Sequence, residues 1–292
     1  MADHTSVHDD RRLTPARADL AAKHLEGKVK AARFVEGELR EVVAPQAPLR
    51  RAPRTDAKLD TEALKGERVM VYESNEEGWS WGQLVNDGYV GWLPTDALRP
   101  AGAPQTDTIS ALRTFVFPGP DIKLTPIETL SFGCKLRIAR TQQEFAVTSD
   151  NGYVPLQHLG NATYQEKDFV AVADRFVGTP YLWGGKTSLG LDCSALVQVG
   201  LTSIGRSCPR DSDLQEQALG SPITPADDFS NLQRGDLLFW KGHVAIVRDN
   251  ATLVHANAYH MAVAIEPIVD AVARIRAAGN KLTSVRRIEE LA

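Results

Sequence analysis

Cysteine is scarce in this sequence. The chain of 292 residues has three, Cys134, Cys193 and Cys208, and they lie far apart. An odd, widely spaced set excludes the disulfide framework of small secreted domains and suits reduced thiols in a cytosol.

Long hydrophobic runs are also missing. The first thirty residues contain no apolar core of a signal peptide, and no later apolar run approaches the length needed to cross a bilayer. We therefore expect a cytoplasmic protein that does not interact with membranes.

Positive charge is not concentrated anywhere in the chain. The formal net charge is −4, and no lysine or arginine block exceeds a short surface run such as Arg50-Arg51. This balance argues against a nucleic-acid partner and against a polyanionic substrate.

The chain does contain enough apolar residues to form the hydrophobic cores of several domains. Hydrophobic residues make up 43% and charged residues 24% of a sequence that is too long for one average domain. Two or three folded domains are expected.

A degenerate repeat of about 65 residues precedes the last part of the chain. Gly66-x-x-Val69-x-Val71 matches Gly133-x-x-Leu136-x-Ile138, and the turn at 86–89 matches the turn at 150–153. Short alternating strands with Asn/Asp-Gly turns are typical of small barrels. Both copies resemble bacterial SH3-like domains. The predicted organisation is a leader over 1–30 with a short helix near 16–25, SH3-like domains over 31–100 and 105–160, and a third domain over 163–292.

Cys193 has the sequence context of a nucleophile. It follows a glycine-rich loop and Asp192, a good helix N-cap, and it precedes an apolar run at 195–199. In the first turn of a helix, unpaired N–H groups and the macrodipole lower a thiol pKa. The alternative is a buried structural cysteine, whose pKa burial would raise.

Two histidines downstream supply a base and a partner for it. Residues 235–240, 243–247 and 252–256 read as strands joined by tight turns. A hairpin centred near Asp249 places His243 opposite His255, so that one imidazole bonds the other. His243, His255 and Asp236 are also the nearest set of metal ligands, but no Cys-x-x-Cys or His-x-x-x-His pattern includes them, and we expect neither a metal nor an organic cofactor.

These motifs together resemble a known family. Tyr181-x-Trp183-Gly184-Gly185, Asp192-Cys193-Ser194, Arg210-Asp211-Ser212-x-x-Gln215, Arg234-Gly235-Asp236, His243-Val244-Ala245 and His255-Ala256 occur in order over about 163–292, as in NlpC/p60-type cysteine peptidases. The resemblance implies an α+β, papain-like catalytic domain. It makes Cys193 the nucleophile, His243 the general base and His255 the third member of the triad. Tyr181 would stabilise the oxyanion, and Trp183, Asp192 and Ser194 would line the substrate site.

The segment with Asp211 and Ser212 has two interpretations. With Gln215 it resembles a helix capping box. In family members that have this segment and two leading SH3-like domains, which recycle murein peptides, the aspartate and serine instead hold a free N-terminal L-Ala. There an acidic residue of the first SH3-like domain helps to bind the ammonium. Glu67 is our candidate for this residue, because the second repeat has Cys134 at the same position and the barrel pattern therefore does not require a charge there. Glu62 is a weaker candidate. Tyr89 either faces the same cleft or packs in its barrel.

The expected activity is hydrolysis of the γ-D-Glu–diamino acid bond in murein tripeptides or tetrapeptides, releasing L-Ala-D-Glu. Two alternatives remain: an acyltransferase or amidase on the same scaffold, and a non-catalytic wall-binding protein. The sequence indicates no oligomeric state.

Overall fold

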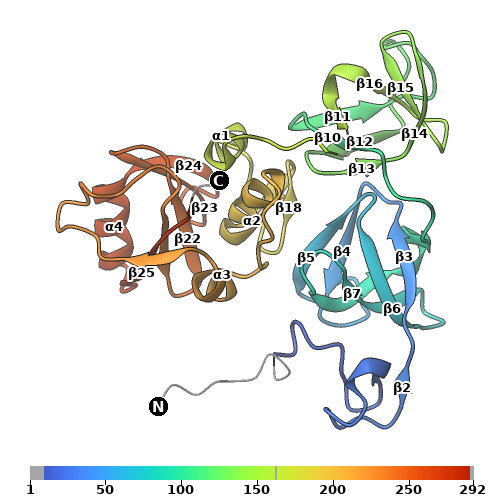
Figure 1. The fold of residues 1–292 in the computed structure, drawn as a ribbon, viewed down its shortest axis with the longest axis horizontal. Helices are drawn as coiled ribbons and strands as arrows, with labels where there is room; N and C mark the ends of the chain where they lie inside the picture. The colour runs from blue at the N-terminus through green and yellow to red at the C-terminus, as the bar shows by residue number, and fades with distance from the viewer. Residues whose placement is uncertain (1–9, 162, 290–292) are drawn as a thin grey trace. The chain divides into compact units, whose positions relative to one another are not determined.

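The computed structural model describes residues 10–161 and 163–289, and the chain divides into two compact units, residues 1–164 and 165–292. The first nine residues of the expected leader and the last three of the expected catalytic domain lie outside the described residues. In Figure 1 the first unit runs from blue to green and the second ends in red at β25 (Leu282–Arg287). No helix in the described part of the chain is long and apolar enough to cross a membrane.

The described part of the leader does not form the helix expected over 16–25. A two-residue strand β1 (Ala21–Ala22) pairs in parallel with β2 (Phe34–Val35), and only η2 (Lys23–Leu25), a 3-10 turn, is helical there. Leu20 and both residues of β1 are fully buried. Three consecutive buried residues do not fit a helix that covers a surface with one face, so burial overrode the local helix signal.

Arg17 attaches this segment to the first barrel. Its guanidinium lies 4.4 Å from the centroid of the Trp81 ring and 5.0 Å from that of Trp92. It also donates to Glu73 Oε2 at 2.5 Å. Cation–π and charge-assisted contacts of this kind hold a leader that has little core of its own.

Residues 38–100 form a barrel-like sheet of seven strands in the order β5-β4-β8-β7-β6-β3-β9. The strands are β3 (Glu38–Val42), β4 (Gln46–Arg50), β5 (Leu59–Leu64), β6 (Arg68–Ser74), β7 (Trp79–Leu84), β8 (Val90–Pro94) and β9 (Leu98–Pro100), with the 3-10 turn η3 (Thr95–Ala97) before β9. Alternate residues point inward, as Ala47 and Leu49 do in β4, and they fill one apolar core.

Residues 107–161 form a second β module with a core of its own. Its strands are β10 (Asp107–Ile109), β11 (Arg113–Val116), β12 (Glu128–Ser131), β13 (Lys135–Leu136), β14 (Ile138–Gln142), β15 (Phe145–Thr148), β16 (Tyr153–Pro155) and β17 (Leu159–Asn161). The 3-10 turn η4 (Leu156–His158) follows Pro155 as η3 follows Pro94. The last turn of this module therefore has the same form as the last turn of the first barrel. Leu64 of β5, in the first barrel, packs into the core of the second module.

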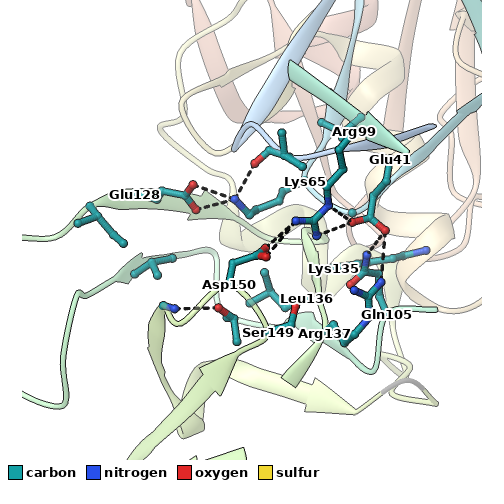
Figure 2. Close-up of a pocket in the computed structure, with 17 residues that line it drawn as sticks. Glu41, Lys65, Arg99, Gln105, Glu128, Lys135, Leu136, Arg137, Ser149 and Asp150 are labelled. Carbon is teal, nitrogen blue, oxygen red and sulfur yellow. Dashed lines mark hydrogen bonds and ion pairs between the residues drawn. The ribbon is translucent and has the colours of Figure 1, made fainter. Parts of the chain in front are cut away.

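A charged cavity of about 90 Å³ lies where the two β modules meet (Figure 2). Glu41 is 1% exposed and accepts hydrogen bonds from Arg99 at 2.8 Å and from Gln105 at 2.6 Å. Lys65 pairs with Glu128 at 2.8 Å across the two modules. Because the charged groups mostly bond one another, we interpret this cavity as a structural joint.

The second unit is built on an antiparallel sheet in the order β20-β25-β21-β22-β23-β24. Its other strands are β20 (Ser221–Ile223), β21 (Leu237–Trp240), β22 (His243–Val247), β23 (Thr252–Asn257) and β24 (Ala262–Pro267), and β18 (Lys186–Thr187) pairs with β19 (Gly190–Leu191) outside it. The helices are α1 (Phe169–Arg175), α2 (Cys193–Ser203), α3 (Ser212–Ala218) and α4 (Ile268–Ala277). Figure 1 shows α4 on one side of the sheet and α1 and α2 on the other.

Candidate active site

The nucleophile candidate begins a helix, as its context predicts. Cys193 is the first residue of α2, and Asp192 is its N-cap, accepting a hydrogen bond from the Ala195 N–H at 2.9 Å. Cys193 is buried, and all three cysteines are free. The N-terminal turn of α2 therefore presents the thiol.

The two histidines meet, although not in the predicted register. In the β22–β23 hairpin, Ile246 pairs with Val254 and Val247 with Leu253, which places the centre of the turn one position later than expected. His243 and His255 are thus diagonal rather than opposite neighbours. They still share a face, and Nε2 of His243 lies 2.9 Å from Nδ1 of His255.

A tight turn and a neighbouring strand set the position of His243. As the first residue of β22 it follows the two-residue turn Lys241-Gly242, and its ring lies 5.5 Å from that of Trp240, its partner in β21. The next residue, Val244, directs its backbone N–H to the sulfur of Cys193. The sulfur of Cys193 therefore lies against the residue that follows His243 in β22.

Burial determines the ionisation of this site. It raises the pKa of the Cys193 thiol to about 12, and the charge of Asp192 adds to this, while N–H groups of Val244 and Ser194 oppose it. Burial also lowers the pKa of His243 to about 3. The lowered thiol pKa expected from the helix N-terminus is wrong for this buried side chain, because the cost of desolvation exceeds the stabilisation by the helix. Both groups are neutral at pH 7.

Tyr181 lies near Cys193. Its backbone N–H donates to the Met261 carbonyl at 2.9 Å, and a parallel bridge joins it to Leu191. Burial raises the pKa of its phenol, and its proximity to Cys193 and to the carboxylate of Asp192 raises that pKa further. The phenol therefore stays protonated and is available as a donor. Trp183, two residues on, is 66% exposed.

Arg210 holds the loop before the nucleophile, a role that sequence reasoning missed. It is 1% exposed and donates to both carboxylate oxygens of Asp192, at 2.9 and 2.8 Å. It also donates to the Ser194 hydroxyl at 2.9 Å, and Ser194 in turn donates to Asp192. These contacts give Asp192 and Ser194, which we expected to line the substrate site, a structural role at the start of α2.

Asp211 does not form the capping box that was one of the two interpretations of this segment. Asp211 occupies the N-cap of α3, but within the described residues its side chain makes no cap hydrogen bond. The Gln215 amide instead donates to the carbonyls of Ser194 and Pro209, both at 2.8 Å. Gln215 thus ties α3 to the first turn of α2, and substrate binding by Asp211 and Ser212 stays a prediction.

The first barrel holds Glu67 and Tyr89 by local contacts. Glu67 accepts hydrogen bonds from the Leu64 N–H at 2.9 Å and from Asn86 at 3.1 Å. Tyr89 is 3% exposed within the barrel core, which favours the packing role over a place in a cleft. Binding of a peptide ammonium by Glu67 stays a prediction.

Glu266, whose carboxylate contacts His255, is a second site residue that the sequence analysis did not identify. Glu266 Oε2 lies 2.7 Å from Nε2 of His255, and Arg274 donates to both oxygens of Glu266, at 3.1 and 2.6 Å. A signal was available in sequence: Glu266 interrupts an apolar strand near a histidine strand.

Metal ligation at His243, His255 and Asp236 does not fit. Asp236 is paired with Arg287 at 2.7 Å. His255, His260 and Glu266 do present donor atoms within 4.8 Å of one another, but Arg274 already pairs with the carboxylate.

Comparison with known sequences identifies two domains in this chain. A bacterial dipeptidyl-peptidase SH3 domain matches residues 49–98, and the NlpC/P60 family matches residues 178–277. The chain is 31% identical over 239 residues to dipeptidyl-peptidase 6 of Lysinibacillus sphaericus, covering 74% of this chain and 86% of that protein. It is 26% identical over 245 residues to the γ-D-glutamyl-L-lysine dipeptidyl-peptidase of Bacillus cereus, covering 72% and 71%. The second β module stays a predicted SH3-like domain.

A solved structure shares the fold. An NlpC/P60 family protein from Bacillus cereus superimposes with a TM-score of 0.71 at 19% identity, covering 86% of this chain and 99% of that one. From the match to dipeptidyl-peptidase 6 and the two family models, the chain belongs to the NlpC/P60 family and is a cysteine peptidase with an SH3-like domain in its N-terminal unit.

Proposed function

We propose that this peptidase hydrolyses the γ-D-glutamyl bond to the diamino acid in murein peptides with a free N-terminal L-Ala, releasing L-Ala-D-Glu. The main structural support for this reaction is the hydrogen bond between His243 and His255, together with the contact between Cys193 and Val244, the residue after His243. The substrate class is supported by the relatives named dipeptidyl-peptidases, one of them for γ-D-glutamyl-L-lysine.

The reaction begins from a neutral thiol and a neutral imidazole. As the sulfur of Cys193 bonds to the γ-carbonyl carbon of D-Glu, its proton passes to His243 and the carbonyl electrons move onto oxygen. The Cys193 backbone N–H and the Tyr181 phenol are the donors that would stabilise this oxyanion.

His243 then completes both halves of the reaction. Its proton goes to the amine of the diamino acid as the carbon–nitrogen bond breaks, leaving a thioester on Cys193. A water molecule gives a proton to His243 as it attacks the thioester, and that proton returns to the sulfur when the dipeptide leaves.

Selection for a free amine would come from carboxylates at the peptide N-terminus. A desolvated ammonium needs an anionic partner, and Asp211 and Glu67 are the two proposed partners. Such a site would favour released peptides over intact cross-linked wall.

Mass spectrometry tests the proposal. L-Ala-γ-D-Glu-L-Lys and L-Ala-γ-D-Glu-diaminopimelate should each yield L-Ala-D-Glu and a free diamino acid, and Cys193→Ala should yield neither. Product that appears only when an acceptor amine is added would indicate the acyltransferase alternative. Binding of purified murein without turnover of either tripeptide would indicate the wall-binding alternative.

A further inference from the structure

We propose that Glu266, held by Arg274, is a positioning residue of the peptidase: it accepts a hydrogen bond from Nε2 of His255 and so fixes the proton positions in both histidines, leaving Nδ1 of His243 as the base. The inference rests on the proposed function, since it takes His243 as the base for Cys193.

The fold places Glu266 on the same sheet face as His255. In the β23–β24 pair, His255 lies opposite Ala264 and Leu253 lies opposite Glu266, so the two polar residues are diagonal neighbours. Leu253 packs in the core cluster with residues of α4. That face is therefore the one that α4 covers, and α4 supplies Arg274.

Glu266 is an acceptor in this arrangement. Its side chain is 12% exposed, and although burial opposes it, hydrogen bonds from Arg274 and His255 hold the pKa of Glu266 below its usual value. An ionised carboxylate has no proton to give. The 2.7 Å contact therefore requires the proton on Nε2 of His255.

One proton position then determines the next. Burial lowers the pKa of His255 to about 4, so the ring is neutral and its Nδ1 carries only a lone pair. That lone pair accepts from Nε2 of His243 at 2.9 Å. His243 is neutral too, so its single proton is on Nε2 and its Nδ1 is free to take the thiol proton.

Among the described residues, His260 also approaches this chain of hydrogen bonds. His260, in the turn after β23, has its Nδ1 3.9 Å from Glu266 and 3.0 Å from the Asn257 side-chain oxygen. Arg274 also lies over the ring of Tyr259, 4.3 Å from its centroid. Arg274 thus contacts both Tyr259 and Glu266. It holds the Glu266 carboxylate in the position from which it bonds His255.

Glu266→Gln tests the assignment with little change of shape. A neutral glutamine no longer requires a proton on Nε2, and its amide N–H₂ favours the other tautomer of His255. That tautomer donates from Nδ1 to His243 and forces the His243 proton onto the nitrogen that must act as base. We expect kcat to fall by roughly 10²- to 10⁴-fold, as a wrong tautomer does in other triads, with KM changed by less than about threefold. Asp270→Asn, an exposed acid on α4, should leave kcat unchanged.

The pH profile separates positioning from mere structural support. The charge of Glu266 raises the pKa of His243, so its removal should move the acidic limb of kcat/KM to lower pH in the residual activity. An ion pair that only stabilised the fold would lower activity without moving that limb.

Nitrogen-15 NMR of histidine-labelled protein decides the point without any substrate. The wild type should show a protonated Nε2 and an unprotonated Nδ1 in both His243 and His255, and Glu266→Gln should reverse the assignment. A protonated Nδ1 on His255 in the wild type overturns the inference, and so does a Glu266→Gln enzyme with normal kcat. An enzyme that does not cleave murein tripeptides but has the expected protonation overturns the substrate proposal instead.

Discussion

Asp192 and Arg210 form a buried ion pair at the start of the helix that carries Cys193. Two nitrogens of the guanidinium contact the two carboxylate oxygens, at 2.9 and 2.8 Å, while the same carboxylate caps the helix. The loop at 184–192 and the first turn of α2 are therefore held by one carboxylate, which also accepts from the Gly184 N–H.

Arg210→Ala should strongly destabilise the protein. It leaves the charge of Asp192 buried without its partner, which costs about 3–5 kcal/mol. The free energy of unfolding from urea denaturation measures this loss. Arg234→Ala is the matched control: its ion pair with Asp168 has side chains 42% and 43% exposed, and it should cost about 1 kcal/mol or less. Equal losses in the two variants would contradict a special role for Arg210.

Cys193 and His243 should act as one catalytic unit. Cys193→Ala and His243→Ala should each abolish turnover, and the double variant should lose no more than either, because each removal already disables the same step. His255→Ala should cost less, since a misoriented imidazole can still accept a proton. His260→Ala should change kcat little. A near-normal kcat in Cys193→Ala or His243→Ala would contradict the assignment of these residues as nucleophile and base.

The thiol should be unreactive in the free enzyme near neutral pH. Because the pKa of Cys193 is raised to about 12, the thiolate fraction is low at pH 7 and rises with pH. Alkylation by iodoacetamide, followed by mass spectrometry at each cysteine, should therefore accelerate from pH 7 to 10. Cys134, whose pKa burial also raises to about 12, is the internal comparison. If Cys193 is labelled faster than an ordinary thiol at pH 6, the result would contradict the raised pKa and support the thiolate expected from sequence.

Acetylating the N-terminal L-Ala of the substrate should lower kcat/KM. The change removes the ammonium that Asp211 and Glu67 are proposed to bind, and loss of one partner of a buried charged contact costs about 2–5 kcal/mol, which corresponds to at least a tenfold fall. Glu67→Gln should narrow the difference between the two peptides, and Glu76→Gln, at an exposed site, should not. Equal turnover of both peptides by the wild type is the contrary result.

Gly66→Ala should disturb the joint between the two β modules. Gly66 has φ +82, and a Cβ there would lie 2.3 Å from the Lys135 carbonyl oxygen of the second module. Gly78 has φ +84 with nothing within 4 Å of a Cβ, so Gly78→Ala measures the backbone strain alone, about 1–2 kcal/mol. The melting temperature should fall further for Gly66→Ala. Equal falls would show that the clash is relieved without cost.

Local sequence determined the parts of the site that depend on neighbouring residues. Asp192 before an apolar run specifies where α2 begins, so the position of Cys193 at its first turn followed from a few residues. The two-residue period of strands placed His243 and His255 on one face, and a register displaced by two residues kept them there.

Tertiary structure decided the rest, because it depends on residues that are distant in sequence. Arg210 reaches Asp192 only once the chain after α2 folds back, and Glu266 reaches His255 only after β24 pairs with β23. The pKa shift of Cys193 has the opposite direction to the expected one for the same reason. A helix N-terminus favours the thiolate locally, but the complete fold buries the sulfur, and the cost of desolvation exceeds that local stabilisation.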